Sequence, residues 1–481
     1  MTRVPEHASE APAASSCGRR KEESMSGLNT AMNTSMSALF AAQVGMSTTG
    51  HNIANANTEG YSRQQMMTSA RRPQVLPWGS IGRGVNIDGI RRVQDEFLTK
   101  NLRVQTSRLA SYETVDSALY EVEGILGSMD NDRIGDALTD FFSAWNDLSQ
   151  ASVQGDLKYN VVAMAENLVT VMHSIDASLS DLEENIELSI ENEVSNLNGL
   201  LTEIGNLNEQ IMSAEVGGQP ANDLRDRRDT LLLKTSELAE ISTVEREDGS
   251  VDVIMGGRTL VARGSVTLFE AVERRSEDGS SESLIVTMGS RREVALSAGR
   301  LRGLVESKDV HVEKVREDLN AVVRKLVDEV NALHTQGRTP QSGGLAFFTG
   351  DTLHTFELNH ALVDSPSLVA TGRTTAESDN DIALAIANLM NESADESGTE
   401  TVGEVYRTTL IGIASKRASF DFMVDSQQNM VNSLEAKSAS ISGVSLDEEA
   451  ANLMIYQNSY TAAARVITVV QEMYDTMLNM V

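Results

Sequence analysis

LDEEAANLMIYQNSYTAAARVITVVQEMYDTMLNMV, residues Leu446–Val481, closes the chain and decides how the rest of it is interpreted. One row of its residues recurs at alternating intervals of four and three, which is the spacing of the a and d positions of a coiled coil. The row is Leu446, Ala450, Leu453, Gln457, Tyr460, Ala464, Ile467, Gln471, Tyr474, Leu478 and Val481. It predicts one unbroken helix, roughly 50 Å long at the usual rise per residue.

This row is polar for a coiled-coil seam, because Gln457, Gln471 and two tyrosines belong to it. A second apolar stripe lies on another face of the same helix and consists of Val466, Val469, Val470, Met473 and Met477. A helix that is apolar on two faces needs neighbours on both, so we expect it to pack between copies of itself and against a helix of the same chain. The two glutamines either fix the register of that packing or face water.

The partner helix is expected near the start of the chain, where the same spacing recurs. Its row is Leu28, Met32, Ser35, Leu39, Ala42, Met46, Thr49 and Ile53. An isolated helix of this composition is marginally stable in water, so the two ends of the chain should pack together. Periodicity alone leaves two arrangements open: packing that forms only in an assembly of many copies, or a helical hairpin within one chain.

The composition is that of a globular, acidic chain. Of its 481 residues 40% are apolar and 4% aromatic, which suits long helices with narrow seams. The net charge of −30 argues against binding to nucleic acid or to an anionic membrane, because both carry negative phosphates. No run of residues is long and apolar enough for a membrane span. Residues 1–24 lack the apolar core of a secretion signal and are expected to be disordered, with Met25 as an alternative start.

The patterns along the chain predict a mainly α protein with long terminal coiled-coil helices and a small inserted antiparallel β domain. Four parts are expected: a disordered extension at 1–24, a terminal coiled-coil domain from 25–63 and 441–481, a mainly helical body from 64–240 and 299–440, and a β domain at 241–298. Within the β domain the apolar period changes to two, and Asp-Gly and Gly-Gly pairs separate short β-prone runs. Residues 64–92 suggest an extended segment with tight turns.

Residues that could carry chemistry are few, and we predict no catalytic residue, no cofactor and no metal site. His51 has no second ligand at helical spacing, which disfavours a metal site there. The glycines of 79–85 lack the spacing of a phosphate-binding loop. Residues 130–135 resemble a calcium loop, but Ile134 stands where a ligand belongs, so a turn with a capped helix start is favoured.

The run Asn222–Asp229, NDLRDRRD, follows a Gly-Gly-Gln-Pro break and predicts the start of a helix. Asn222 or Asp223 is the expected N-cap, since both side chains can accept a bond from a backbone N–H in the first turn. The alternating charges favour ion pairs between residues three or four apart, on a face exposed to water.

Three motifs resemble those of a known family. NIANANTEGYSR resembles the N-terminal signature of bacterial flagellar rod, hook and hook-associated proteins, and its signature residues here are Asn52, Asn55, Thr58, Gly60, Tyr61 and Arg63. SGVSLDEEAANL is similar to the C-terminal signature of the hook-associated protein 1 (FlgK) family, with Gly443, Asp447, Glu448 and Glu449. NDLRDRRD resembles a body motif of the same family.

The resemblance implies a structural, non-enzymatic protein that is secreted unfolded through the flagellar type III export apparatus. It implies a place outside the cell, at the junction of hook and filament. The implied partners are copies of itself in a ring, the hook protein below, a second junction protein or flagellin above, and a cytosolic export chaperone at the C-terminal helix. The two terminal rows, Leu28 to Ile53 and Leu446 to Leu478, would form the self-assembly interface. The alternative is another flagellar axial protein, a hook or distal rod subunit.

The sequence departs from the longer members of that family between Phe348 and Phe356. Those members carry an additional outer β domain at this place, which we expect to be absent here. Residues 1–24 have no counterpart in the family.

Overall fold

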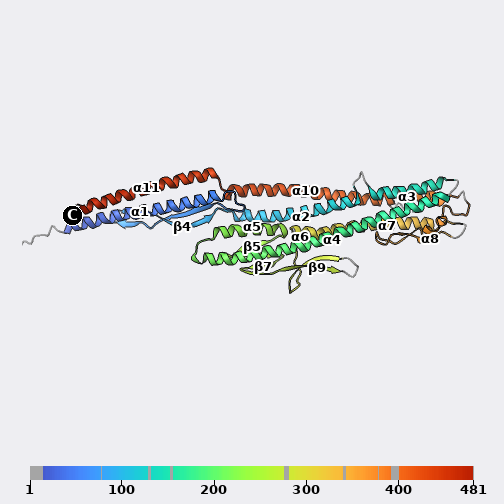
Figure 1. The fold of residues 1–481 in the computed structure, drawn as a ribbon, viewed down its shortest axis with the longest axis horizontal. Coiled ribbons are helices and arrows are strands. Elements are labelled where there is room, and N and C mark those ends of the chain that lie inside the picture. The colour runs from blue at the N-terminus through green and yellow to red at the C-terminus, as the bar shows by residue number, and fades with distance from the viewer. Residues whose placement is uncertain are drawn as a thin grey trace, which may run out of the picture.

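The computed structural model describes residues 15–76, 79–127, 132–151, 155–275, 281–339, 343–376, 379–391 and 400–479. They form a long helical rod, with the first and last helices together at one end and a β unit on one side of the middle (Figure 1). The prediction of a mainly α protein with small inserted antiparallel sheets is confirmed.

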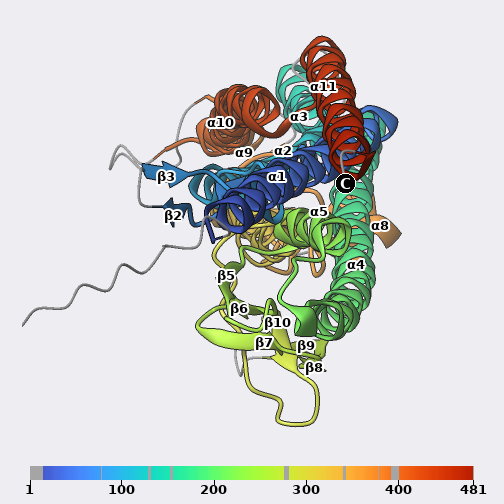
Figure 2. The same cartoon turned by 90° about the vertical axis from the view of Figure 1, so that its left-hand side faces the viewer.

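The two terminal helices, α1 (Ser15–Ala54) and α11 (Leu446–Asn479), pack side by side (Figures 1 and 2). They run antiparallel, because Tyr474 near the end of α11 donates to Asn29 near the start of α1. The helical hairpin within one chain is therefore formed. Our expectation of disorder at 1–24 is wrong for residues 15–24, which continue α1 because a helix grows easily once it is nucleated. Residues 1–14 lie outside the described residues.

The line along which α11 packs is shifted from the predicted row. Its buried or half-buried residues are Glu449, Asn452, Leu453, Tyr456, Ala463, Ala464, Ile467, Val470, Tyr474 and Met477. The predicted row supplies four of them, and it leaves exposed Leu446, Ala450, Gln457, Tyr460, Gln471 and Leu478. Six of the buried or half-buried residues stand one position before a member of the predicted row. The predicted row is thus not the intramolecular seam, and the second apolar stripe is divided between the two sides.

On α1 the contact uses small side chains. Ser35, Ala42 and Thr49 of the predicted row are buried, whereas Ile53 at its end is 37% exposed. The four remaining members of the row are half-buried: Leu28, Met32, Leu39 and Met46. A Cβ on Gly45 would lie 2.6 Å from the ring of Tyr456, so the close approach of the two helices requires glycine there.

A long hairpin lies along α1. Its strands β1 (Gln64–Ala70) and β4 (Val85–Arg92) are antiparallel, and β2 (Gln74–Leu76) pairs with β3 (Gly79–Ile81) towards its tip. The backbone N–H of Val85 donates to the hydroxyl of Ser37 on α1 at 3.3 Å. We therefore propose that residues 64–92 belong with the terminal helices rather than with the body.

The body is a bundle of long helices. They are α2 (Glu96–Leu126), α3 (Arg133–Gln150), α4 (Gly155–Ala214), α5 (Asn222–Leu238), α6 (Arg300–Glu306), the π-helical turn η2 (Ser307–Val312), α7 (Glu313–His334), α9 (Asp381–Asn388) and α10 (Val402–Ser442). Three short turns complete it: η1 (Glu215–Gly217), α8 (His360–Asp364) and η3 (Pro366–Leu368). Because α10 packs along α2 and α7, segments from both halves of the chain share one core.

The β unit projects from the side of α4 (Figure 2). One sheet has the order β5 (Ser242–Glu245), β6 (Val251–Met255), β7 (Arg258–Ala262) and β8 (Ser265–Val266). The second is the hairpin of β9 (Phe269–Arg275) and β10 (Ser281–Thr287). The predicted Gly-Gly turn is confirmed, since Gly256 and Gly257 have φ of 54° and 74°, a conformation that favours glycine. The predicted turn at Asp278-Gly279 lies outside the described residues.

The far end of the rod is closed by an aromatic cluster. Phe141, Trp145, Phe347 and Phe356 are fully buried there. The short strands β11 (Phe348–Thr349) and β12 (Glu357–Leu358) form a hairpin. This is the place where the longer members of the family that the motifs resemble were expected to carry an additional β domain. Gly350 begins its loop with φ of 80°, and a Cβ there would lie 1.9 Å from the carbonyl of Thr355.

His334 is buried among these rings and is held in one neutral form. Its Nδ1 lies 2.6 Å from the carbonyl oxygen of Leu345, which can only accept, so Nδ1 carries the proton. Its Nε2 then accepts from the backbone N–H of Ala370 at 3.0 Å. Burial lowers the pKa of His334 from 6.5 to about 4.

We expect acid to destabilise the far end through His334. In the unfolded chain the imidazole takes up a proton below its usual pKa of 6.5, whereas in the folded protein it stays neutral down to a pKa of about 4. The free energy of unfolding therefore decreases as the pH is lowered from 6.5 to about 4. The loss is about 3 kcal/mol over that interval. Urea denaturation followed by tryptophan fluorescence measures it. His334→Gln should flatten the profile, and His360→Gln, at an exposed position, should not. Equal slopes in all three proteins would contradict the assignment.

Candidate functional site: the joint between terminal helices and body

The three sequence motifs, far apart in the chain, meet at one place. The end of α1, the turn into β1, the start of α5 and the start of α11 converge where the terminal helix pair joins the body (Figure 1). We define this joint by Asn52, Arg63, Arg92, Asp226 and Glu449. It is the candidate functional site, and it is built from polar groups that are largely withdrawn from water.

Asn52 is the centre of the joint and is 1% exposed. Its Nδ2 donates to the carbonyl oxygen of Gln64 at 2.9 Å and to Oε2 of Glu449 at 3.1 Å. Its Oδ1 accepts from the backbone N–H of Gln64 at 2.9 Å and from the hydroxyl of Tyr61 at 2.8 Å. Both ends of the amide are satisfied, so Asn52 fixes the turn from α1 into β1 and ties it to α11.

Arg63 links the turn to the other end of the chain. Its backbone N–H donates to the carbonyl of Ser442 at 2.9 Å, at the end of α10. Its guanidinium donates to Glu449 and to Glu448, each at 2.8 Å. The Glu449 side chain is only 2% exposed and that of Arg63 is 25% exposed, so this ion pair is largely withdrawn from water, whereas Glu448 is 62% exposed.

The start of α5 contradicts two sequence predictions. The N-cap is Ala221, not Asn222 or Asp223, and the N–H of Ala221 is bound by the Glu215 side chain at 2.8 Å. The side chain of Asn222 instead donates to the carbonyl of Ile90 at 3.0 Å, which ties α5 to β4.

Of the charges at the start of α5, only Asp223 and Arg227 are exposed to water. Asp226 is 5% exposed and Arg228 is 1% exposed. Asp226 accepts from Arg92 at 2.8 Å and from the backbone N–H of Ser62 at 3.1 Å. Arg92 also donates to Asp229 at 2.7 Å. The buried acids and arginines of this run bind segments that are distant in the sequence. The alternating pattern alone does not reveal these partners.

Burial shifts the titration of the groups in the joint. It raises the pKa of Tyr61, and Asp223, Asp226 and Glu449 raise it further. It also raises the pKa of Asp226, against the opposing effect of the bond from Arg92. For Arg92 burial acts against the charge, but Asp229 and Asp226 outweigh it and the pKa is raised. The joint is thus a network of compensated charges.

The remaining signature residues shape the same turn. Asn55 donates to the carbonyl of His51 at 3.0 Å, and Thr58 donates to the Asn55 side chain at 3.3 Å. Gly60 has φ of 74°, and a Cβ there would lie 2.1 Å from the hydroxyl oxygen of Thr230. Gly443 ends α10, whereas Asp447 is exposed in the first turn of α11. Sequence analysis missed Gln64, Arg92 and Asp226 as their partners, because no local pattern relates them.

The polar side chains of the joint bind one another and backbone groups of distant segments. Among the described residues, no group of three or more His, Cys, Asp or Glu side chains could hold a metal ion. Nor does any helix in the described part of the chain have the length and apolar character to cross a membrane. What the joint can do is fix the direction in which the terminal helix pair leaves the body.

Long terminal helices that meet a helical body at these signatures agree with the class that the motifs indicated, the axial proteins of the bacterial flagellum. Residues 32–61 match the model of the flagella basal body rod protein family, and 435–480 match the C-terminal model of the flagellar basal body rod FlgEFG proteins. Residues 119–348 match the helical domain of the flagellar hook-associated protein FlgK. The chain is thus similar to the FlgK proteins and is a structural component of the flagellum.

Curated relatives support this over nearly the whole chain. The flagellar hook-associated protein 1 of Bacillus subtilis is 27% identical, with 93% of this chain and 97% of that protein aligned. The protein of the same name from Salmonella typhimurium is 24% identical, with 94% and 100% aligned. The flagellar hook junction protein FlgK from Burkholderia pseudomallei has the same fold, with a TM-score of 0.63 and 14% identity over 71% of this chain and 100% of that structure.

We expect Arg63→Gln to loosen the joint without unfolding the body. The substitution leaves the Glu449 carboxylate buried without its cation, which costs about 3 kcal/mol locally. Hydrogen exchange followed by mass spectrometry should show faster exchange in 446–453. The control is Arg71→Gln, whose guanidinium is exposed and binds only the Asn86 side chain among the described residues. If exchange in 446–453 is the same in both variants, the ion pair does not hold α11.

Proposed function

We propose that this protein is a building block of the junction between hook and filament, in which the terminal helices of many copies associate. The observation that carries the proposal is the apolar side of α11 that α1 does not cover. The intramolecular seam buries one side of α11, while the other side remains apolar and exposed. The relative of known structure is itself named a flagellar hook junction protein.

The open surface is large for a chain that stays alone in solution. Along α11 the exposed fractions are 60% for Met454 and Ile455, 47% for Val469 and 49% for Met473. On α1 Phe40 is 59% exposed. Apolar surface of this extent marks an interaction site. Because it runs along both terminal helices, packing of neighbouring copies side by side would cover it, together with the six members of the predicted α11 row that stay exposed.

The partners follow from that position. We infer that the hook protein lies on one side of a ring of copies and a second junction protein or flagellin on the other. A cytosolic export chaperone would cover the apolar side of α11 before assembly. The match to the FlgK helical domain, in addition to the rod-type matches at the ends, favours this position over that of a hook or distal rod subunit.

We also propose that the protein catalyses no reaction. The carboxylates of the joint are engaged by Arg63, Arg92 and backbone groups, so none of these is poised to act as a general base. Its role is mechanical: it transmits a fixed direction from the body to the terminal helices.

Deleting residues 446–481 should abolish assembly and leave the body and the β unit folded. The body core and the β unit make their contacts without α11, because α11 packs mainly on α1. The truncated protein should keep the circular dichroism of the body but fail to restore swimming to a strain that lacks the native protein. Growth of filaments on hooks that carry the truncated protein would contradict the proposal.

Two substitutions on opposite sides of α11 separate assembly from folding. Val469→Asp adds a charge to the open side, where Val469 is 47% exposed, so the monomer should keep its stability within about 0.5 kcal/mol while swimming is lost. Ala463→Asp places a charge in the seam with α1, where Ala463 is 7% exposed. It should unfold the terminal pair in the monomer, which hydrogen exchange measures. If Val469→Asp assembles normally, the open side of α11 is not the interface.

A further inference from the structure

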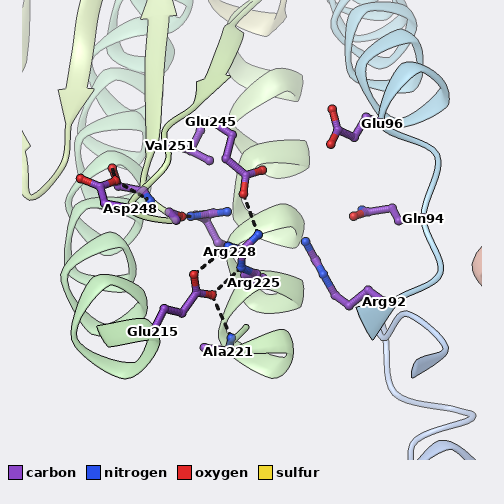
Figure 3. A network of polar contacts seen from close by, with 12 residues as sticks. Arg92, Gln94, Glu96, Glu215, Ala221, Arg225, Arg228, Glu245, Asp248 and Val251 are labelled. Carbon is purple, nitrogen blue, oxygen red and sulfur yellow. Dashed lines mark hydrogen bonds and ion pairs between the residues drawn. The ribbon is translucent and has the colours of Figure 1, made fainter. Parts of the chain in front are cut away.

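A second polar site lies beside the joint and has a different character. A cavity of about 750 Å³ opens between the start of α2, the start of α5 and strand β5. We call it the arginine cavity, because its walls carry Arg91, Arg92, Lys100, Arg103, Arg225 and Arg228. Only three of its lining residues are acidic: Glu96, Asp229 and Glu245. Figure 3 shows Arg92, Arg225 and Arg228 around this space. This concentration of cations contrasts with the net charge of −30 that the chain carries.

Two of these arginines have their charge fully matched within the chain. Arg225 donates to Glu215 and to Glu245, each at 2.6 Å, as Figure 3 shows. Arg92 donates to Asp226 at 2.8 Å and to Asp229 at 2.7 Å. Both therefore have carboxylates within contact distance, and they form the fixed frame of the cavity.

The other two buried arginines, Arg103 and Arg228, have no ion pair with any described residue. Arg103 is 8% exposed and donates to the hydroxyl of Thr243 at 3.0 Å. Arg228 is 1% exposed and donates to the Asn208 side chain at 3.2 Å and to the carbonyl of Gly249 at 2.7 Å. In both, Nε is buried and has no hydrogen-bond partner among the described residues. These are two buried cations whose donors are only partly used.

Burial lowers the pKa of both side chains, that of Arg228 to about 10. Asp229 acts in the opposite direction on both, but its carboxylate is taken by Arg92 and by Gln94. Leaving a buried cation without a partner is costly, and natural proteins rarely retain two of them unless a ligand supplies the missing charge. A guanidinium with a free N–H edge is suited to a planar or tetrahedral oxyanion.

We propose that the arginine cavity binds an oxyanion, which Arg103 and Arg228 hold. The class of ligand is a carboxylate or an inorganic anion such as sulfate. Two sources share this chemistry: an acidic side chain of another copy of this chain, which carries 70 Asp and Glu residues, or an anion free in solution. Occupancy would join α2, α5 and β5 across the cavity and stiffen the connection between body and β unit.

The first experiment uses the intact monomer and sodium sulfate. Thermal unfolding is compared in sodium sulfate and in sodium chloride at equal ionic strength, and sulfate binding is measured by calorimetry. The wild type should bind sulfate and unfold at a higher temperature in sulfate. Arg103→Met should weaken that binding roughly tenfold or more. In chloride it should unfold at the same or a higher temperature than the wild type, because an unmatched buried charge is gone.

Two further variants make the result specific. Arg103→Lys keeps the charge and should retain part of the sulfate binding. Arg407→Gln removes an exposed arginine on α10, far in sequence from the cavity, and should behave as the wild type. A purely structural role of Arg103 would make Arg103→Met unfold earlier in chloride and leave the sulfate response intact. That outcome, or an equal response to sulfate in all four proteins, overturns the proposal.

A second experiment distinguishes the source of the anion, and only this one rests on the proposed function. Arg103→Met is expressed in a strain that lacks the native protein. Failure to assemble, with a folded monomer, assigns the site to an acidic side chain of a neighbouring copy. Normal swimming together with lost sulfate binding assigns it to a free anion.

Discussion

The carboxylate of Glu449 is withdrawn from water at the point where the chain ends meet the body, and its charge must be matched there. Arg63 and Asn52 supply the match from a segment almost four hundred residues earlier. A buried carboxylate is tolerated only in the geometry that satisfies it, so it selects one arrangement of α1, α11 and α10 from the many that apolar packing alone would allow. Hydrophobic contacts supply most of the stability of the rod, whereas this contact specifies the direction of its end.

The two polar sites on either side of Arg92 illustrate opposite uses of buried charge. In the joint each acid meets a cation or a backbone N–H, so the network is closed and rigid. In the arginine cavity Arg225 is closed in the same way, but Arg103 and Arg228 are not. The contrast lies within one helix, since α5 contributes to both. Because α5 takes part in both networks, this one helix connects the terminal helices, the body and the β unit.

The sequence was sufficient for the elements and their kind, because helix and strand periods are local. The terminal helices, the breaks between the body helices and the strand runs of the β unit follow from them. The seam of α11 was not predictable, since Tyr456 precedes Gln457 and Ala463 precedes Ala464, so that two rows one residue apart fit equally well. The packing on α1 decides between them, with Gly45 admitting the ring of Tyr456. The joint was missed for a different reason: burial of Asp226 depends on Ser62 and Arg92, and no spacing in the sequence relates these three residues.

The hairpin between Thr349 and Glu357 has a wider consequence. Its two strands hold the ends of the loop together at the outer tip of the rod, on a foundation of buried aromatic rings. The entropic cost of lengthening a loop grows only slowly with its size when its ends are already fixed. Extra residues, whether acquired in evolution or engineered as a foreign domain, can therefore be inserted at this position without disturbing the helices beneath.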